Sequence, residues 1–532
     1  MTIREYLLSD AGTSRGAMFL KILFRIGIIA SILWIAYFIF ETITTPYPIE
    51  YREGVSQVMA QIFLKGGNPF TLEYQPLAMN NYGIVYDLVV YPFAALFGNT
   101  LAVHRSVTFL FLLSTFLLIF KRVSKDNKDL YFTLACSTII LISLTGRDGL
   151  GAFPSAAGVF LFLAATLIPF DRSFDDRGLL ISALIGVIAY YTKPYFVLSF
   201  GIVASYVFLF ISKKKGLLYT LVFALIFGVF YFFIRQVFSL YFIDTFLGNI
   251  VNATRSLGHL YAQLIELAKE FFPVIVLAFG FLFLRVNNLK SAHVSEESRP
   301  LVNILSFDQP WFSIQFDYYF YFLLCSTLAF VFVLGLHIGA NMLYAYQLMV
   351  PPFCLWLFQK INPGTRLGLI SIPLILLNFV LLVFVLLNPN FLSEKNSQEW
   401  ARLYNYVNDS THILNSPVIT SAIVERGTLP VDSGQTEYYY RFDPYPHDKF
   451  LGPDYDIIKS NGRKYKDGII DSVKNVKYDK VILSKGELLS DWKYAFVYGD
   501  LIQHYQLTDT FAVDMPQVDQ KWTVEVWEPI RR

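Results

Sequence analysis

The sequence predicts an α-helical polytopic membrane protein with a small α/β domain at its carboxyl end. Three observations support this fold class: 55% of the 532 residues are hydrophobic, only 16% are charged, and the hydrophobic residues are gathered in long runs. Soluble domains carry about 25% charged residues, and a helix needs about 20 apolar residues to cross a bilayer. The composition excludes a soluble enzyme, a disordered chain and a collagen-like fibre, and the net charge of +2 gives no reason to expect nucleic acid as a partner.

The first predicted span is the apolar run from Ile26 to Phe40, which follows the basic residues Arg15, Lys21 and Arg25. A secretory signal peptide would carry a small-residue cleavage site after such a run, but Glu41 and a threonine-rich stretch stand there instead. We therefore expect an uncleaved first span.

Ten further apolar runs predict spans, which makes eleven in all. They lie near residues 104–120, 130–145, 155–170, 179–192, 195–211, 217–234, 271–285, 319–337, 342–358 and 367–388. The stretch 83–97 is also apolar, but it is short, contains Pro92 and bears Asp87. We expect it to be a juxtamembrane helix that lies along the membrane surface rather than a span.

The distribution of basic residues predicts the orientation. With eleven spans and a cytoplasmic amino terminus, the cytoplasmic segments hold 18 lysines and arginines and the opposite segments hold 7. Cytoplasmic loops of membrane proteins are enriched in these residues. If 83–97 were a span, the basic clusters 121–128 and 213–215 would face outwards. We therefore expect a multi-pass protein of the plasma (inner) membrane whose carboxyl end is extracytoplasmic.

A change in composition near Asn390 divides the chain into a transmembrane domain, residues 1–390, and a soluble extracytoplasmic domain, residues 391–532. The second part lacks any apolar run long enough to span a membrane. The segment 397–408 has helical spacing, with Trp400 and Leu403 on one face. Strand-like runs follow at 417–424, 478–483, 494–497 and 522–527, so we expect a small α/β fold.

Polar residues close to the predicted spans are candidates for function, because polar groups are expensive near the membrane. The first group lies in the long loop after span one, where Arg52 and Glu53 are followed by Tyr82 and Tyr86. A carboxylate such as Glu53 can act as a general base on a hydroxyl. The alternative is a solvated acid paired with Arg52.

Three more groups lie on the same side of the membrane by the charge argument. Arg147 and Asp148 stand between glycines at the end of the third span, where they form either a ligand site or a salt-bridged turn. Lys193 separates two spans and either binds a phosphate or extends to lipid headgroups. Polar residues at the start of the tenth span either bind substrate or bond neighbouring helices; these are Asn341, Tyr344 and Gln347.

Motifs for other chemistries are absent from the sequence. There is no phosphate-binding loop, no GxGxxG and no zinc motif, which argues against an ATP-driven pump and against the use of a cytosolic nucleotide sugar. The three cysteines, Cys136, Cys325 and Cys354, lie in apolar runs and are expected to be small core residues.

A series of short motifs after the first span resembles a known family. In chain order they are Tyr51-Arg-Glu-Gly, Gly66-Gly-Asn-Pro-Phe, Tyr82-Gly-Ile-Val-Tyr, Phe97-Gly98 and His104-Arg105. This order is similar to that of the GT-C superfamily of membrane glycosyltransferases, which includes protein O-mannosyltransferases and lipid A aminoarabinose transferases. In the resemblance, Glu53 occupies the acidic position of the first outer loop and Asp148 that of the second. Lys193 matches a lysine that contacts the donor phosphate.

The resemblance implies an enzyme that moves a sugar from a polyprenyl-phosphate donor to an acceptor hydroxyl on the extracytoplasmic side, with inversion. Glu53 would be the general base, Asp148 a second catalytic acid, and Lys193 and Arg147 the ligands of the donor phosphate. The acceptor would be a glycan, a lipid or a protein. Further substrate contacts are expected from Arg52, Tyr82, Tyr86, Asn341, Tyr344 and Gln347.

The need for a cofactor is left open by the resemblance. Members of the superfamily often carry a pair of acidic residues where this chain has Arg52 before Glu53. The residues therefore predict no metal site, and the use of a divalent metal ion stays open.

Two other functions remain as alternatives. A lipid-linked polysaccharide polymerase or ligase would need arginines in a late outer loop, where this chain has few. A transporter of lipids or glycans, without covalent chemistry, often shows internal repeats, and none is visible in this sequence.

Overall fold

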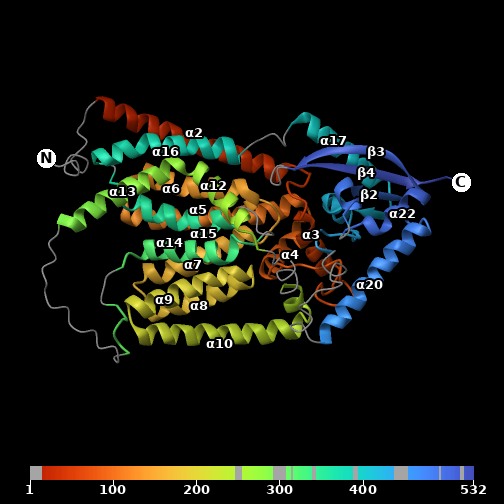
Figure 1. Ribbon diagram of the computed structural model, residues 1–532, viewed down its shortest axis with the longest axis horizontal. Helices are drawn as coiled ribbons and strands as arrows, with labels where there is room; N and C mark the ends of the chain where they lie inside the picture. Colours follow the sequence, from red (N-terminus) through yellow and green to blue (C-terminus); the bar gives the residue numbers. More distant parts are fainter. Residues whose placement is uncertain are drawn as a thin grey trace.

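The computed structural model describes residues 15–245, 255–291, 307–312, 316–337, 343–362, 364–387, 393–436, 453–490, 493–515 and 520–531. A bundle of helices occupies most of the molecule, and a small sheet with its own helices covers one end of this bundle (Figure 1). The amino-terminal helix begins at the opposite end of the bundle.

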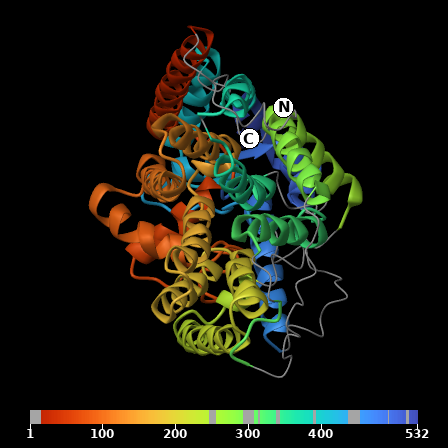
Figure 2. The ribbon, with the colours of Figure 1, turned by 90° about the vertical axis from the view of Figure 1, so that its left-hand side faces the viewer.

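Within the residues that the structure describes, four helices of the bundle are long and apolar enough to cross a membrane. They are α2 (Arg15–Thr44), α5 (Leu101–Asp126), α10 (Lys213–Val237) and α16 (Arg366–Leu386). Helices α2 and α10 lie at opposite edges of the bundle, as the views in Figures 1 and 2 both show.

Seven other helices run alongside these four. They are α6 (Leu130–Leu144), α7 (Ser155–Asp171), α8 (Asp176–Tyr190), α9 (Leu198–Phe210), α13 (Phe272–Ser291), α14 (Tyr318–Ala329) and α15 (Leu343–Phe358). Each of the eleven predicted spans coincides with one helix of this set. The expected fold class, a polytopic helical membrane protein with a small α/β part at the carboxyl end, is confirmed.

Polar side chains fix where several of these helices begin. Thr100, Asp129, Asp175, Ser212 and Thr365 each accept a hydrogen bond from a backbone N–H of the first turn of α5, α6, α8, α10 and α16. Such caps satisfy N–H groups that have no partner within the helix. The apolar runs are therefore bounded by short polar signals at the ends of the bundle.

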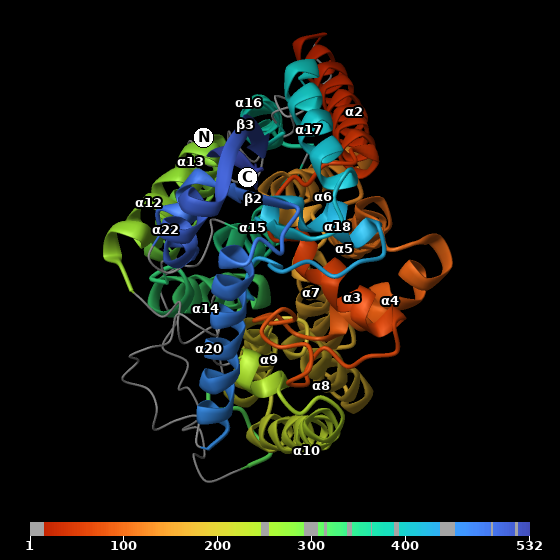
Figure 3. The same ribbon diagram turned by 90° about the vertical axis from the view of Figure 1, so that its right-hand side faces the viewer.

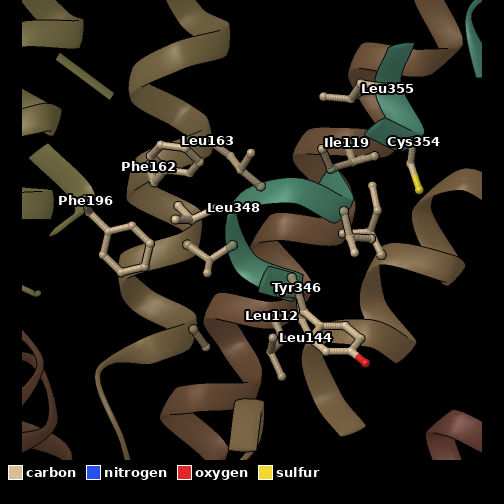
Figure 4. Close-up of a cluster of buried hydrophobic side chains, with 14 of the residues drawn as sticks. Leu112, Ile119, Leu144, Phe162, Leu163, Phe196, Tyr346, Leu348, Cys354 and Leu355 are labelled. Carbon is tan, nitrogen blue, oxygen red and sulfur yellow. The ribbon is translucent and has the colours of Figure 1, made fainter. Parts of the chain in front are cut away.

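The centre of the bundle is filled by side chains from helices far apart in the sequence. Figure 4 shows Leu112 and Ile119 of α5, Phe162 and Leu163 of α7, and Leu348 of α15 in one buried cluster. Cys136 and Cys354 are also buried in this core, as their sequence context predicts.

Two short helices follow α2 at the end of the bundle next to the sheet. They are α3 (Glu53–Leu64) and α4 (Val85–Phe97), and they pack against each other. Helix α4 buries Tyr86 and Val90 but exposes Leu96 and Phe97. A short helix with one apolar face exposed at the bundle end fits the expected position along the membrane surface.

The carboxyl-terminal part contains a four-stranded sheet in the order β1-β2-β4-β3, and β1 and β2 are parallel. The strands are β1 (Ile413–Asn415), β2 (Lys480–Ser484), β3 (Tyr505–Met515) and β4 (Gln520–Pro529). The helices are α17 (Glu394–Asn408), α18 (Thr420–Glu425), α20 (Pro453–Lys474), α21 (Lys485–Leu488) and α22 (Ala495–His504). Figure 3 shows α20 running from the sheet across the end of the bundle towards α10.

Two of the strands expected in this part are wrong. The run 417–424 forms a short helical turn and then α18, and the run 494–497 lies at the start of α22. Pro417 opens the first helical turn, and both segments pack their apolar side chains against the sheet instead of joining it. The helix expected at 397–408 and the strands expected at 478–483 and 522–527 are confirmed.

Candidate functional site

The candidate site is built where the loop before α4 meets the turn between α8 and α9. The Gly83 N–H donates to the carbonyl oxygen of Thr192 (3.0 Å), and the Val85 N–H donates to that of Tyr191 (3.1 Å). A Cβ atom at Gly83 would lie 1.9 Å from the Tyr191 carbonyl oxygen. Glycine is therefore required for this approach of two backbones, and the contact places Tyr82 beside Lys193.

Lys193 is the centre of the site. Its side chain is 5% exposed, and its Nζ donates to Ser155 Oγ at 2.8 Å. The same nitrogen lies 4.6 Å from the ring centre of Tyr82 and 5.8 Å from those of Tyr195 and Tyr344. Cation–π contacts of this kind stabilise an ammonium group that has been withdrawn from water.

Arg52 joins the site through the hydroxyl group of Tyr82. Its Nη1 donates to Tyr82 Oη at 3.2 Å, and its Nε and backbone N–H both donate to the carboxylate of Glu50. The guanidinium also lies over the ring of Phe153. Arg52 is 22% exposed while Glu50 is 1% exposed, so the cation borders solvent and the carboxylate lies behind it.

Helix α15 closes the site with two polar side chains. Tyr344 packs edge-on against Tyr195 with their ring centres 4.7 Å apart, and Gln347 Oε1 accepts a hydrogen bond from Tyr195 Oη at 2.5 Å. Because residues three apart share one face of a helix, both side chains point to the same side of α15.

Five residues predicted from the sequence thus come together from four segments of the chain: Arg52, Tyr82, Lys193, Tyr344 and Gln347. The segments are the loop after α2, the loop before α4, the turn after α8, and α15. We call this group, with Glu50, Ser155 and Tyr195, the Lys193 cluster.

Glu53 lies next to this cluster but faces a different partner. Its Oε1 accepts from Arg105 Nε and the Ala152 N–H, both at 2.9 Å. Its Oε2 accepts from Arg105 Nη2 at 2.7 Å and the Ile49 N–H at 2.8 Å. Glu53 and Arg105 are both fully buried. A general base needs a carboxylate oxygen that reaches a substrate hydroxyl. Each oxygen of Glu53 already accepts two hydrogen bonds. The role of Glu53 as the general base stays a prediction.

Tyr86 does not join the Lys193 cluster. It is fully buried inside α4, where its hydroxyl pairs with Thr108 Oγ1 (2.9 Å) and with the carbonyl oxygen of His104 (3.1 Å). Tyr82 lies in the loop before α4 and Tyr86 in the first turn of α4, so the two side chains face different surroundings. The substrate contact expected of Tyr86 stays a prediction.

Three further predicted residues are not settled by the structure. Arg147 and Asp148 lie in the short π-helical turn Thr145–Gly149 between α6 and α7, and their side chains are outside the described part. Asn341 also lies outside the described residues.

Glu50, Arg105, Ser155 and Tyr195 were not singled out as functional residues by the sequence. Glu50 and Tyr195 each lie two positions from a predicted site residue, Arg52 and Lys193 respectively. Their closeness in sequence to these residues could have identified both. Arg105 belongs to one of the short motifs that resemble the GT-C superfamily. The sequence did not indicate that its partner is Glu53, which lies 52 residues earlier in the chain. Among the residues that the structure describes, no group of three histidine, cysteine or acidic side chains could hold a metal ion.

Fold and site together define a class: a polytopic membrane protein whose polar site lies at one end of the helical bundle, beside a carboxyl-terminal α/β part. No protein-family model matches the chain, and no curated protein sequence matches it either.

Among solved structures, this chain is similar to ArnT from Cupriavidus metallidurans in the apo state, with a TM-score of 0.53 and 11% sequence identity. The match covers 94% of this chain and 98% of that chain. The crystal structure of the same ArnT bound to undecaprenyl phosphate matches over the same shares, with 11% identity and a TM-score of 0.49. At this identity the likeness establishes the fold, and the resemblance to the GT-C fold expected from the sequence is confirmed at that level.

Proposed function

We propose that this chain is a membrane glycosyltransferase that moves a sugar from a polyprenyl-phosphate donor to a hydroxyl of a glycan, lipid or protein acceptor. We place the reaction at the Lys193 cluster, on the extracytoplasmic side. The observation that carries this proposal is the convergence of a buried lysine, an arginine and three tyrosines from four segments at one end of the bundle.

Lys193 and Arg52 are the proposed ligands of the donor phosphate. A buried ammonium is stabilised when an anion completes its surroundings, and lysine and arginine are common phosphate ligands. The tyrosine rings of Tyr82, Tyr195 and Tyr344 supply flat apolar surfaces beside the cation. A lipid phosphate whose chain lies between helices would meet both kinds of group at this place.

The proposed chemistry is a single displacement. The acceptor oxygen attacks the anomeric carbon of the sugar, the bond between that carbon and the phosphate oxygen breaks, and polyprenyl phosphate leaves. One displacement inverts the configuration of the carbon. The leaving phosphate gains charge, so cations already fixed in place lower the barrier.

The acceptor proton goes to a carboxylate, and we propose Glu50 for this role in place of Glu53. Glu53 is enclosed by Arg105 and two backbone N–H groups. Glu50 is covered by Arg52, a side chain that already borders solvent and contacts Tyr82. When Arg52 turns towards a donor phosphate, it uncovers the Glu50 carboxylate.

The experiment that tests the proposal compares Lys193→Ala with Lys213→Ala. Lys213 is a suitable control because it is also buried, packs against the Trp311 ring, and lies at the other end of the bundle. A charge-assisted hydrogen bond contributes about 1.5–3 kcal/mol, so Lys193→Ala should weaken undecaprenyl phosphate binding roughly 10- to 100-fold. Lys213→Ala should leave it unchanged.

Binding is measured on the purified protein in detergent with undecaprenyl phosphate, and transfer with a polyprenyl-phosphate sugar and a glycan acceptor. Unchanged lipid affinity in Lys193→Ala would contradict the phosphate role. Binding of the lipid without any transfer by the wild-type protein would contradict the enzyme and favour a lipid transporter.

A further inference from the structure

The carboxyl-terminal part contacts the first outer loop at several separate places. A Cβ atom at Gly54 of α3 would lie 2.4 Å from a side-chain carbon of Thr420, so α18 packs directly on the start of α3. The Asn461 side chain of α20 donates to the Gln75 carbonyl oxygen at 2.7 Å. The loop that carries Arg52 and Tyr82 is therefore held by residues from the other end of the sequence.

The contact nearest to the site is made by Gln435. The Asn81 N–H donates to Gln435 Oε1 at 2.8 Å, and the next residue is Tyr82. Tyr82 in turn meets both Arg52 and Lys193. One hydrogen bond thus joins the carboxyl-terminal part to Asn81, the neighbour of the tyrosine that meets both proposed phosphate ligands.

Gln435 is itself held in a tight polar turn. The Gly434 N–H donates to Asp432 Oδ1 at 2.7 Å, and the Ser433 N–H donates to Thr436 Oγ1 at 3.2 Å. Gly434 has a φ of 112°, a value that side-chain-bearing residues rarely adopt, and Gln435 is 2% exposed. The turn around Gln435 is therefore held by its own hydrogen bonds, independently of the contact between Gln435 and Asn81.

The receiving loop is restrained on its other side by Asn80. The Tyr82 N–H donates to Asn80 Oδ1 at 3.0 Å, and Asn80 Nδ2 donates to Asp87 Oδ2 of α4 at 3.2 Å. Tyr82 is thereby held between α4, the Tyr191–Lys193 turn and Gln435. Of these three supports, only Gln435 comes from the carboxyl-terminal part.

We propose that Gln435 is a positioning residue for sugar transfer: by fixing Asn81, it holds Tyr82 against Lys193 and Arg52, so the carboxyl-terminal part completes the donor site. The proposal rests on the function proposed above. It gives this part a role in donor binding, in addition to any contact with the acceptor.

The test compares three variants of the full chain. Gln435→Ala removes the acceptor of the Asn81 N–H, and Gln435→Glu retains an acceptor oxygen at the same place. Gln263→Ala is the matched control, because Gln263 is equally buried and also bonds a backbone group, the Gly335 carbonyl oxygen at 3.0 Å, in a different region.

Three quantities are measured: amide hydrogen exchange of the peptide covering residues 79–84, the affinity for undecaprenyl phosphate, and the melting temperature. One lost hydrogen bond corresponds to about 1 kcal/mol, so Gln435→Ala should speed exchange of this peptide and raise the Kd for the lipid about fivefold. KM for the donor should rise more than kcat falls. Gln435→Glu should restore the exchange rate of this peptide and the Kd for the lipid, and Gln263→Ala should change neither quantity.

The outcomes separate this proposal from the function on which it rests. If the wild-type protein does not bind undecaprenyl phosphate, the proposed function fails, while the exchange data still show whether Gln435 holds the loop. If the wild-type protein binds the lipid and Gln435→Ala matches it in exchange and affinity, the positioning role is wrong. A fall in melting temperature with unchanged lipid affinity would reduce Gln435 to a structural residue and also overturn the proposal.

Discussion

Two glutamates three residues apart are held by different arginines, and the proposal that Glu50 is the general base rests on this difference. The Arg105 guanidinium uses all five of its N–H donors. Two go to Glu53, and three go to the backbone carbonyl groups of Thr42, Thr45 and Tyr47. Glu53 therefore helps to fold the loop after α2. Arg52 bonds Glu50 with fewer of its donors and borders solvent.

The two glutamates should respond differently to replacement by glutamine. Glu53→Gln leaves the buried Arg105 without its counter-charge, which should destabilise the fold by about 3–5 kcal/mol. Glu50→Gln should fold normally and lose roughly 10²- to 10⁴-fold in transfer rate, the usual contribution of a general base. Melting temperature and transfer rate are measured on both variants. Near-normal transfer by Glu50→Gln, together with a stable but inactive Glu53→Gln, would return the base role to Glu53.

The members of the site could be predicted from the sequence more readily than their contacts. The sequence makes Lys193 and Tyr82 candidates because each is a polar or aromatic residue beside an apolar run, and the charge pattern predicts that both lie at one end of the bundle. Their contact depends on Gly83, whose missing side chain lets two backbones meet. The ion pair between Glu53 and Arg105 could not be predicted, because the neighbouring Arg52 is an equally good partner for Glu53 on charge alone.

Helix α4 shows how an element can carry a carboxyl group on its buried face. Asp87 is 2% exposed, and burial raises its pKa to about 8. The ordinary pKa of an aspartate is about 3.9, so the folded protein binds a proton here that the unfolded chain has released. Between about pH 4 and pH 8 the free energy of unfolding should therefore fall as the pH rises.

Asp87→Asn should remove this pH dependence, because the amide resembles the neutral carboxyl group in shape and cannot ionise. At pH 9 the variant should exceed the wild-type protein in stability by at least about 1.4 kcal/mol, the equivalent of one pKa unit. At about pH 4, near the pKa of the unfolded chain, the two should be similar. Melting temperatures in detergent from about pH 4 to pH 9 test this, and parallel curves for the two proteins would show that Asp87 is not buried as a neutral acid.

At the scale of elements, the spans were predictable and the small sheet was only partly so. A membrane helix is marked by a long apolar run, a signal that tertiary contacts rarely override. The short apolar runs near 417–424 and 494–497 fit a strand or a buried helix equally well, and both are helical. The sequence did not reveal strand β3, because Asp509 interrupts its apolar alternation at the point where the pairing with β4 shifts register.

The molecule as a whole places its proposed chemistry at the junction of two parts. The Lys193 cluster lies at the bundle end that carries α3 and α4, and residues of the carboxyl-terminal part bond the same loop. The distribution of lysine and arginine along the sequence agrees with this position of the cluster. The segments poor in lysine and arginine are the ones that meet at the sheet end, while the amino-terminal helix starts at the other end (Figure 1).

This arrangement makes a prediction about which side of the membrane each end faces. After replacement of the three native cysteines by alanine, Lys214→Cys at the start of α10 should be protected from an impermeant thiol reagent in intact cells. Lys474→Cys, at the end of α20, should react. Both positions are exposed and lie at opposite ends of the molecule, so burial does not explain a difference. The reverse pattern would place the Lys193 cluster in the cytoplasm, and the extracytoplasmic reaction proposed here would then be wrong whichever residue serves as the base.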